Sequence, residues 1–189
     1  SGVLQADIEN LRQVALNEDR RTFDTAVNRI VGARHIYILG ARSSTHLAGY
    51  LHFYMQMIFE NVTLVQSTAA GEIFEQLFRC GEGDVMIALS FPRYSKDTIN
   101  AVRFAKSRGV EIVAITDQEQ SPVAQMSAAA LLAPSEMLSF IDSMTAPLSL
   151  INALLVGIAT KMGTDVTETF STLESLWDQY GVFGGADDE

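Results

Sequence analysis

Two short segments of the chain combine hydroxyl side chains with an arginine. Residues 40–45 are Gly-Ala-Arg-Ser-Ser-Thr, and residues 90–95 are Ser-Phe-Pro-Arg-Tyr-Ser. Each segment follows a short apolar run and precedes a stretch with helical periodicity, so each is expected at a helix amino terminus. Unpaired N–H groups at such a terminus, together with hydroxyl donors and guanidinium groups, favour a bound phosphate or carboxylate. The candidate ligands are Arg42, Ser43, Ser44, Ser90, Arg93 and Ser95.

A simpler explanation applies to each turn taken alone, because Ser and Thr at helix starts are common N-caps. Two such turns, each with an arginine, favour the anion-binding interpretation. The first turn is not a dinucleotide-binding motif, because Arg42 stands where that motif needs its second glycine. An NAD-binding domain is disfavoured further because Gln66 and Ser67, rather than an acid, end the next apolar run.

Five apolar runs predict the strands of one sheet, over residues 35–40, 61–66, 84–90, 110–116 and 128–133. Predicted helices alternate with them, over 43–60, 68–78, 95–108, a short one from 121, then 140–162 and 166–180. Strands that are apolar throughout are buried on both faces, and alternation with helices implies parallel pairing. The predicted fold class is α/β, a three-layer sandwich with a five-stranded parallel sheet of flavodoxin-like type and helices on both faces. Ligands bind such sheets beyond the carboxyl ends of the strands, where both turns fall.

Length and charge bound the domain organisation. A chain of 189 residues suits one domain. We expect connecting helices over 1–34, the α/β domain over 35–183 and an acidic tail over 184–189. The net charge is −10, and residues 109–189 hold 12 acidic side chains against one basic side chain, Lys161. No basic stripe is present, so nucleic-acid binding through this chain itself is not expected.

Composition also disfavours disulfide-stabilised and membrane-spanning classes. The single cysteine, Cys80, cannot form an internal disulfide or a cysteine-cluster zinc site, and it fits a reducing cytoplasm. The longest uncharged run, 143–160, contains Pro147, Asn152 and several hydroxyls. Its length and polarity favour a buried core helix over a membrane span.

Three further residues become candidates if the chain is an enzyme. Glu136, just past the last predicted strand, is the carboxylate best placed to act as a general base. His46 and His52 lie on one predicted helix, where either could reach a ligand. Because they are six residues apart, they do not share a face as zinc ligands would. We therefore expect no metal site and no cofactor.

The two turns resemble those of the SIS (sugar isomerase) domain family, whose first turn usually reads Gly-x-Gly-x-Ser and whose third reads Ser-x-Ser-Gly-x-Thr. On that pattern Ser44 takes the place of the phosphate-binding serine, Ser90 that of the first serine, and Ser95 that of the threonine. Pro92 and Arg93 depart from it. Pro92 lacks both a hydroxyl and an N–H donor, whereas Arg93 supplies the N–H donors of a charged guanidinium group instead.

The variant Ser-Phe-Pro-Arg-Tyr-Ser is similar to the effector domain of RpiR-type transcription regulators, as is Ala-Ile-Thr-Asp at 114–117 followed by Ser121 and Pro122. The resemblance covers roughly residues 20–180. In that family a helix-turn-helix domain precedes the SIS domain, and residues 1–34 leave no room for one, so DNA contact is expected only through a helix-turn-helix domain that this chain lacks.

The resemblance implies a non-catalytic, cytoplasmic sensor that binds a phosphorylated sugar and forms a homodimer or a higher homo-oligomer, with no membrane partner. The apolar face of residues 3–16 and the helix around 140–161 are candidate dimer surfaces, although both also suit core packing. The alternative is a phosphosugar isomerase, in which Glu136 would act with His46 or His52.

Overall fold

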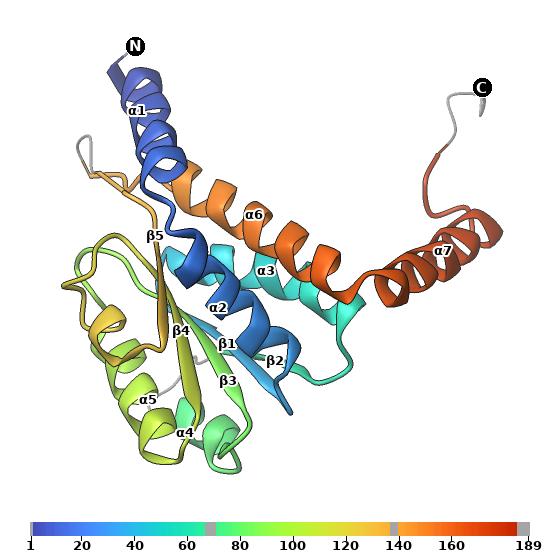
Figure 1. The fold of residues 1–189 in the computed structure, drawn as a ribbon, viewed down its shortest axis with the longest axis horizontal. Helices are drawn as coiled ribbons and strands as arrows, with labels where there is room; N and C mark the ends of the chain where they lie inside the picture. The colour runs from blue at the N-terminus through green and yellow to red at the C-terminus, as the bar shows by residue number, and fades with distance from the viewer. Residues whose placement is uncertain (1, 67–70, 137–139, 185–189) are drawn as a thin grey trace.

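The computed structural model describes residues 2–66, 71–136 and 140–184. Its centre is a five-stranded, all-parallel sheet (Figure 1). The strands are β1 (Ile36–Gly40), β2 (Val62–Val65), β3 (Val85–Leu89), β4 (Glu111–Thr116) and β5 (Ala129–Leu132). They lie in the order β2-β1-β3-β4-β5, which confirms the predicted flavodoxin-like sheet. In this order the chain reverses direction across the sheet between β1 and β3, and ligands bind at the carboxyl side of that point.

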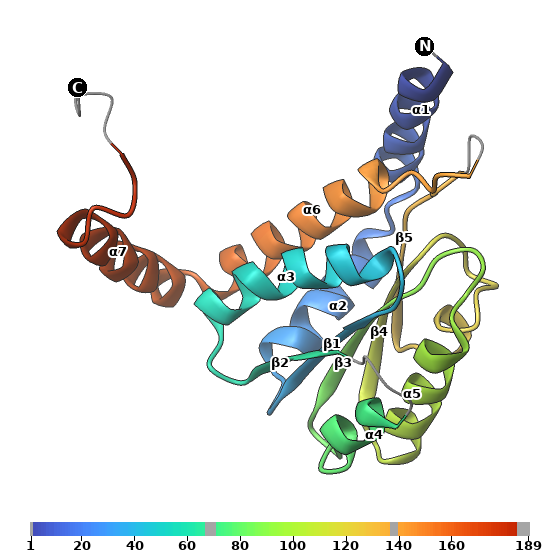
Figure 2. The same ribbon diagram turned by 180° about the vertical axis from the view of Figure 1, so that it is seen from behind.

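Helices cover both faces of the sheet, as predicted. On one face lie α2 (Arg20–Val31), α3 (Ser44–Ile58) and α6 (Thr145–Met162), with α1 (Gly2–Asn17) packed on α6. On the other lie α4 (Glu72–Leu77), α5 (Lys96–Ser107) and the 3₁₀ turn η1 (Ala124–Met126). The last helix, α7 (Thr164–Gln179), follows α6 and extends away from the body of the molecule (Figures 1 and 2).

The three layers follow from the alternation of side chains along the strands. In β1, Ile36 and Ile38 pack with α2, α3 and α6, whereas Tyr37 and Leu39 pack with α4 and α5. Successive side chains of a strand point to opposite faces, so an all-apolar strand builds two cores at once. This explains why the central strands show continuous apolar runs in the sequence.

The predicted helix 140–162 begins later than expected, at Thr145. Pro147 accounts for the difference. In a helix starting at residue 140, its ring would clash with the carbonyl of Ser143 and one helical hydrogen bond would be lost. Starting at Thr145 places Pro147 in the first turn, where N–H groups have no helical partner in any case. Residues 140–144 therefore form a non-helical segment between β5 and α6.

Two other predicted helices are shorter than expected. The helix predicted over 68–78 is α4, which starts at Glu72, and residues 67–70 lie outside the described part of the chain. The helix predicted from Ser121 is reduced to the single turn η1.

The apolar helix α6 is a core helix. Within the described ranges it is the one helix long and apolar enough, by length and composition, to cross a membrane. Its side chains Leu150, Ile151, Leu154 and Ile158 are buried against the sheet and its neighbouring helices. A Cβ on Gly157 would lie 2.8 Å from the ring of Phe23 on α2. The helix thus packs closely on α2, in agreement with the prediction of a buried core helix.

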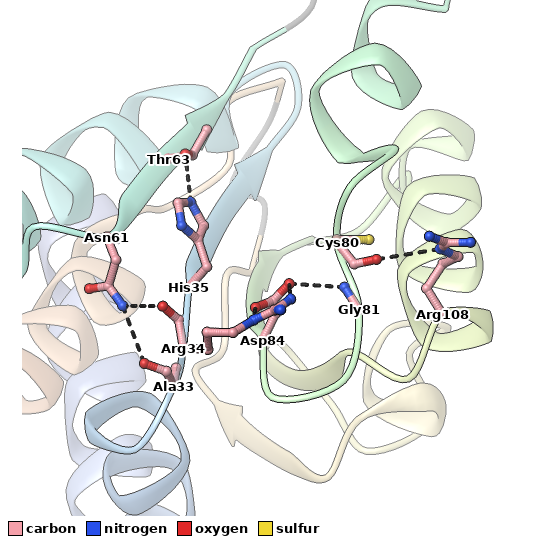
Figure 3. A network of polar contacts seen from close by, with 9 residues as sticks. All are labelled: Ala33, Arg34, His35, Asn61, Thr63, Cys80, Gly81, Asp84 and Arg108. Atoms are coloured by element: carbon pink, nitrogen blue, oxygen red, sulfur yellow. Dashed lines mark hydrogen bonds and ion pairs between the residues drawn. The ribbon is translucent and has the colours of Figure 1, made fainter.

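A polar network joins the amino ends of three strands, at the edge of the sheet away from the two turns (Figure 3). The guanidinium of Arg34 donates two hydrogen bonds to the buried carboxylate of Asp84, at 2.9 and 3.0 Å. The backbone N–H of Gly81 donates a third, at 2.9 Å. Asn61, just before β2, donates to the carbonyl of Ala33 at 3.2 Å. These contacts fix the starts of β1, β2 and β3 relative to one another.

Burial of Asp84 would raise its pKa, but the hydrogen bonds from Arg34 and Gly81 outweigh that effect and hold the pKa below its usual value. A carboxyl group whose pKa is lower in the folded than in the unfolded state stabilises the fold above its unfolded pKa, near 4. That contribution disappears as the pH falls through the folded pKa.

We expect Asp84→Asn to lower the free energy of unfolding at pH 7 by about 2 kcal/mol, because it removes charge-assisted hydrogen bonds from a buried site. At about pH 3 the difference from the unmodified chain should be smaller, because the unfolded chain then takes up a proton at Asp84 more readily than the folded chain does. Urea unfolding at both pH values measures it, with the exposed Glu174→Gln as control. An equal difference at both pH values would contradict the ionic role of Asp84.

Candidate functional site

A cavity of about 380 Å³ lies at the carboxyl ends of β1 and β3, at the predicted edge of the sheet. The residues predicted as anion ligands all line it: Arg42, Ser43, Ser44, Ser90, Arg93 and Ser95. The two turns come from strands that pair directly, with Gly40 beside Leu89. The structure therefore brings together two segments about fifty residues apart in the sequence.

The first turn depends on Gly40, the last residue of β1. A Cβ at this position would lie only 2.6 Å from the carbonyl oxygen of Ser44, so a side chain here would push α3 away from the strand. Ser44 is buried, and its N–H donates to the carbonyl of Ala41 at 3.1 Å. Ser43 occupies the N-cap position of α3, but its side chain makes no capping hydrogen bond. The capping explanation thus does not account for the Ser43 hydroxyl.

The second turn is held at both ends. Ser90 is buried, and its N–H donates to the carbonyl of Ile115 on β4 at 3.1 Å. The hydroxyl of Tyr94 donates to Asp117 at 2.8 Å. Burial and the nearby Asp117 carboxylate raise the pKa of Tyr94, which keeps it a donor. Ser95 is the N-cap of α5 and, like Ser43, makes no side-chain capping bond.

Arg42 and Arg93 both have left-handed backbone conformations, with φ of 56° and 63°. Among the described residues other than glycine, they are the two with positive φ. Both stand at glycine positions of the SIS pattern quoted above. The two turns thus keep a backbone shape suited to glycine while carrying a long cationic side chain, at a cost of about 1 kcal/mol each. Both arginines are exposed at the cavity, where they can offset the charge of an anion.

The three residues proposed for catalysis do not line this cavity. His46 is exposed and His52 half-buried on α3. Glu136 is exposed beyond β5, beside a separate hollow lined by residues of α1. The structure therefore does not bring Glu136 into the cavity with either histidine.

Other cavity residues were missed by sequence reasoning. Thr98 lies three residues after Ser95, a helical spacing that could have indicated it. Asp142 and Met144 lie on the segment that was expected to be helical, so no sequence pattern placed them at the cavity. This segment also contacts α1, because the hydroxyl of Ser143 donates a hydrogen bond to the carboxylate of Asp7.

A parallel α/β domain with hydroxyl-rich helix starts and arginines at its switch point belongs to the class of domains suited to phosphorylated small molecules. The SIS domain family matches residues 29–157, more than half of the sequence. The chain therefore belongs to the SIS domain family.

Individual relatives agree with this assignment. The sugar isomerase domain of the RpiR transcription factor from Sphaerobacter thermophilus superposes with a TM-score of 0.86 at 26% identity, over 92% of this chain and 97% of that one. The NanR protein of Vibrio vulnificus, solved with ManNAc-6P, shares the fold with a TM-score of 0.81 at 20% identity, over 96% of this chain and 69% of NanR.

A curated relative is an enzyme. The isomerizing glutamine–fructose-6-phosphate aminotransferase of Pyrobaculum aerophilum is 31% identical over 120 residues, which cover 63% of this chain. The match spans 19% of that protein's length. The family to which this chain belongs thus contains both regulators and enzymes.

We expect Arg93→Gly and Arg93→Ala to weaken inorganic phosphate binding equally, because both remove the guanidinium. The alanine variant keeps the left-handed strain at this position, whereas glycine relieves it. The free energy of unfolding should therefore be about 1 kcal/mol higher for Arg93→Gly than for Arg93→Ala. Urea unfolding and calorimetric titration measure the two effects separately. Equal stability of the two variants would contradict the strain.

Proposed function

We propose that this chain is the phosphosugar-binding, dimerising effector domain of an RpiR-type transcription regulator. The observation that carries the proposal is the cavity itself. Four serines, two arginines and the starts of α3 and α5 converge on it, and neither N-cap hydroxyl is used for capping. Such a group of donors suits a phosphate, and a cavity of about 380 Å³ leaves room for a sugar attached to it.

The charge of the chain makes these local donors necessary. With a net charge of −10, the overall field opposes an anionic ligand. Ser44, Ser90 and Ser95 would donate hydrogen bonds to the anion at short range, and Arg42 and Arg93 would add positive charge. These contacts contribute more to the free energy of binding than the repulsion from distant acidic side chains, which solvent and salt screen.

The similarity to the Sphaerobacter thermophilus RpiR domain, which extends over nearly the full length of both chains, supports a sensor over an enzyme. The position of Glu136, His46 and His52 outside the cavity supports it as well. The second candidate is a phosphosugar isomerase. It is favoured by the match to an isomerizing aminotransferase and by one carboxylate, Asp142, at the cavity.

As a regulator, the domain would work in the cytoplasm and reach DNA through a helix-turn-helix domain. Ligand binding would shift a dimer between two states and so reorient the attached DNA-binding domains. The proposed contact with a second copy uses α1, which presents Val3, Leu4, Ile8 and Leu16 to solvent. Large apolar side chains grouped on one helix are typical of a protein interface.

Ser44→Ala and Ser90→Ala should each weaken binding of the best phosphosugar by about tenfold or more, because each removes a hydrogen bond to a charged phosphate. A thermal-shift screen of sugar phosphates identifies that ligand, and calorimetric titration measures its affinity. Ser171→Ala, on the distant helix α7, is the matched control. If Ser44→Ala binds as well as the unmodified chain, the phosphate is not bound at this turn.

The same ligand, incubated with the chain, should remain unconverted. Conversion that disappears in Asp142→Asn, which alters the carboxylate at the cavity, would establish the isomerase instead.

The double variant Leu4→Lys, Ile8→Lys should be monomeric at concentrations where the unmodified chain is a dimer. These residues are one helical turn apart, so they share a face of α1, and two lysines per copy would repel across the contact. Sedimentation equilibrium measures the oligomeric state, with Gln13→Lys, on the same helix, as control. A dimer that persists in the double variant would place the interface elsewhere.

A further inference from the structure

Two buried polar atoms at the cavity have no hydrogen-bond partner among the described residues: Thr98 Oγ1 and Asp142 Oδ1. Thr98 is only 1% exposed, so water does not reach its hydroxyl in this state. Buried polar groups are nearly always paired, because leaving one unpaired destabilises the fold. Two such groups lining one cavity indicate that a ligand supplies the missing partners.

The two groups differ in what they can bind. Thr98 lies in the first turn of α5, one turn beyond Ser95, so its hydroxyl adds a donor to the group of hydroxyls at the helix start. Asp142 comes from a different element, the segment before α6. An ionised carboxylate accepts hydrogen bonds and donates none. A phosphate placed against Asp142 would be repelled, whereas a sugar hydroxyl would donate to it.

On the basis of the proposed function, we propose that the cavity has two chemically distinct ends. Thr98 extends the phosphate-binding end formed by the serines, and Asp142 forms an end that accepts a hydrogen bond from a ligand hydroxyl. The arrangement orients the ligand, with its phosphate at the helix starts and its sugar hydroxyls at Asp142. It also sets the ligand class: phosphosugars that are uncharged beyond the phosphate are bound, and phosphosugar acids are repelled.

The test of Asp142 uses two ligands of which only one carries a carboxylate at the end away from the phosphate. The chain is titrated calorimetrically with glucose 6-phosphate, with 6-phosphogluconate and with inorganic phosphate; another aldose phosphate and its acid replace the first pair if the screen prefers them. We expect the unmodified chain to bind the aldose phosphate about tenfold or more tightly than the acid, because like charges repel across a binding site.

In Asp142→Asn we expect the aldose phosphate to bind about tenfold more weakly and its preference over the acid to disappear. Binding of inorganic phosphate should stay within twofold of the unmodified chain. Glu174→Gln, which removes the same charge from the exposed face of α7, should change none of these affinities.

Thr98→Val tests the other end. The variant keeps the shape of the side chain and removes the unpaired hydroxyl, so the melting temperature without ligand should rise by about 3 °C. Affinity for every phosphorylated compound, inorganic phosphate included, should fall. A structural role for the hydroxyl predicts the opposite change in stability, and would overturn the assignment of Thr98.

The outcomes distinguish this inference from the proposed function. If Asp142→Asn keeps the preference for the aldose phosphate while Ser44→Ala loses binding, the inference is wrong and phosphosugar binding stands. If no phosphorylated compound binds the unmodified chain, the proposed function fails as well. If the chain converts a phosphosugar and Asp142→Asn does not, Asp142 is a catalytic base, and the assignment of a purely hydroxyl-accepting role is overturned.

Discussion

The direct pairing of β1 with β3 determines where the site lies. Because the chain crosses the sheet in opposite directions from these two strands, α3 packs on one face and α5 on the other. Their amino termini therefore meet at the gap between the two turns, which is the cavity described above. Gly40 makes the approach on the β1 side possible, since any Cβ there would meet the backbone of Ser44. The hydrogen bond from Ser90 to Ile115 holds the β3 side to its neighbour β4.

Several features that oppose stability lie at this gap. Two arginines adopt a conformation that suits glycine, two N-cap serines leave helix starts without a side-chain cap, and Thr98 and Asp142 carry buried atoms without a partner. The opposite edge of the sheet shows the reverse, with the carboxylate of Asp84 fully bonded to Arg34 and Gly81. Such local costs gather where a protein is shaped for a ligand rather than for its own stability.

The sheet could be predicted from the sequence because its physical signal is local. A strand buried on both faces is apolar along its central positions, and 36–39, 85–89 and 112–115 show this directly. The two turns could be placed at the site for the same reason, since parallel strands end at one edge.

The rest of the site could not be predicted, because it depends on contacts between distant segments. The helical periodicity of the sequence continues back to Phe140, and the constraint on Pro147 makes α6 begin at Thr145 instead. The sequence therefore places Asp142 in a helix and indicates Glu136 as the carboxylate best placed for the site. Three-dimensional packing reverses that choice, with Asp142 at the cavity and Glu136 beside α1.

The hydrogen bond from Ser143 to Asp7 connects the segment that lines the cavity to the amino-terminal helix α1. Ser143 adjoins Asp142, so a ligand that fixes one residue restricts the other, and with it the carboxylate on α1. Coupling of this kind is reciprocal in free energy. A partner that bound α1 and changed the ligand affinity would have its own affinity for α1 changed by the ligand by the same factor. The hydrogen bond between Ser143 and Asp7 is the structural link through which binding at the cavity and binding at α1 would depend on each other.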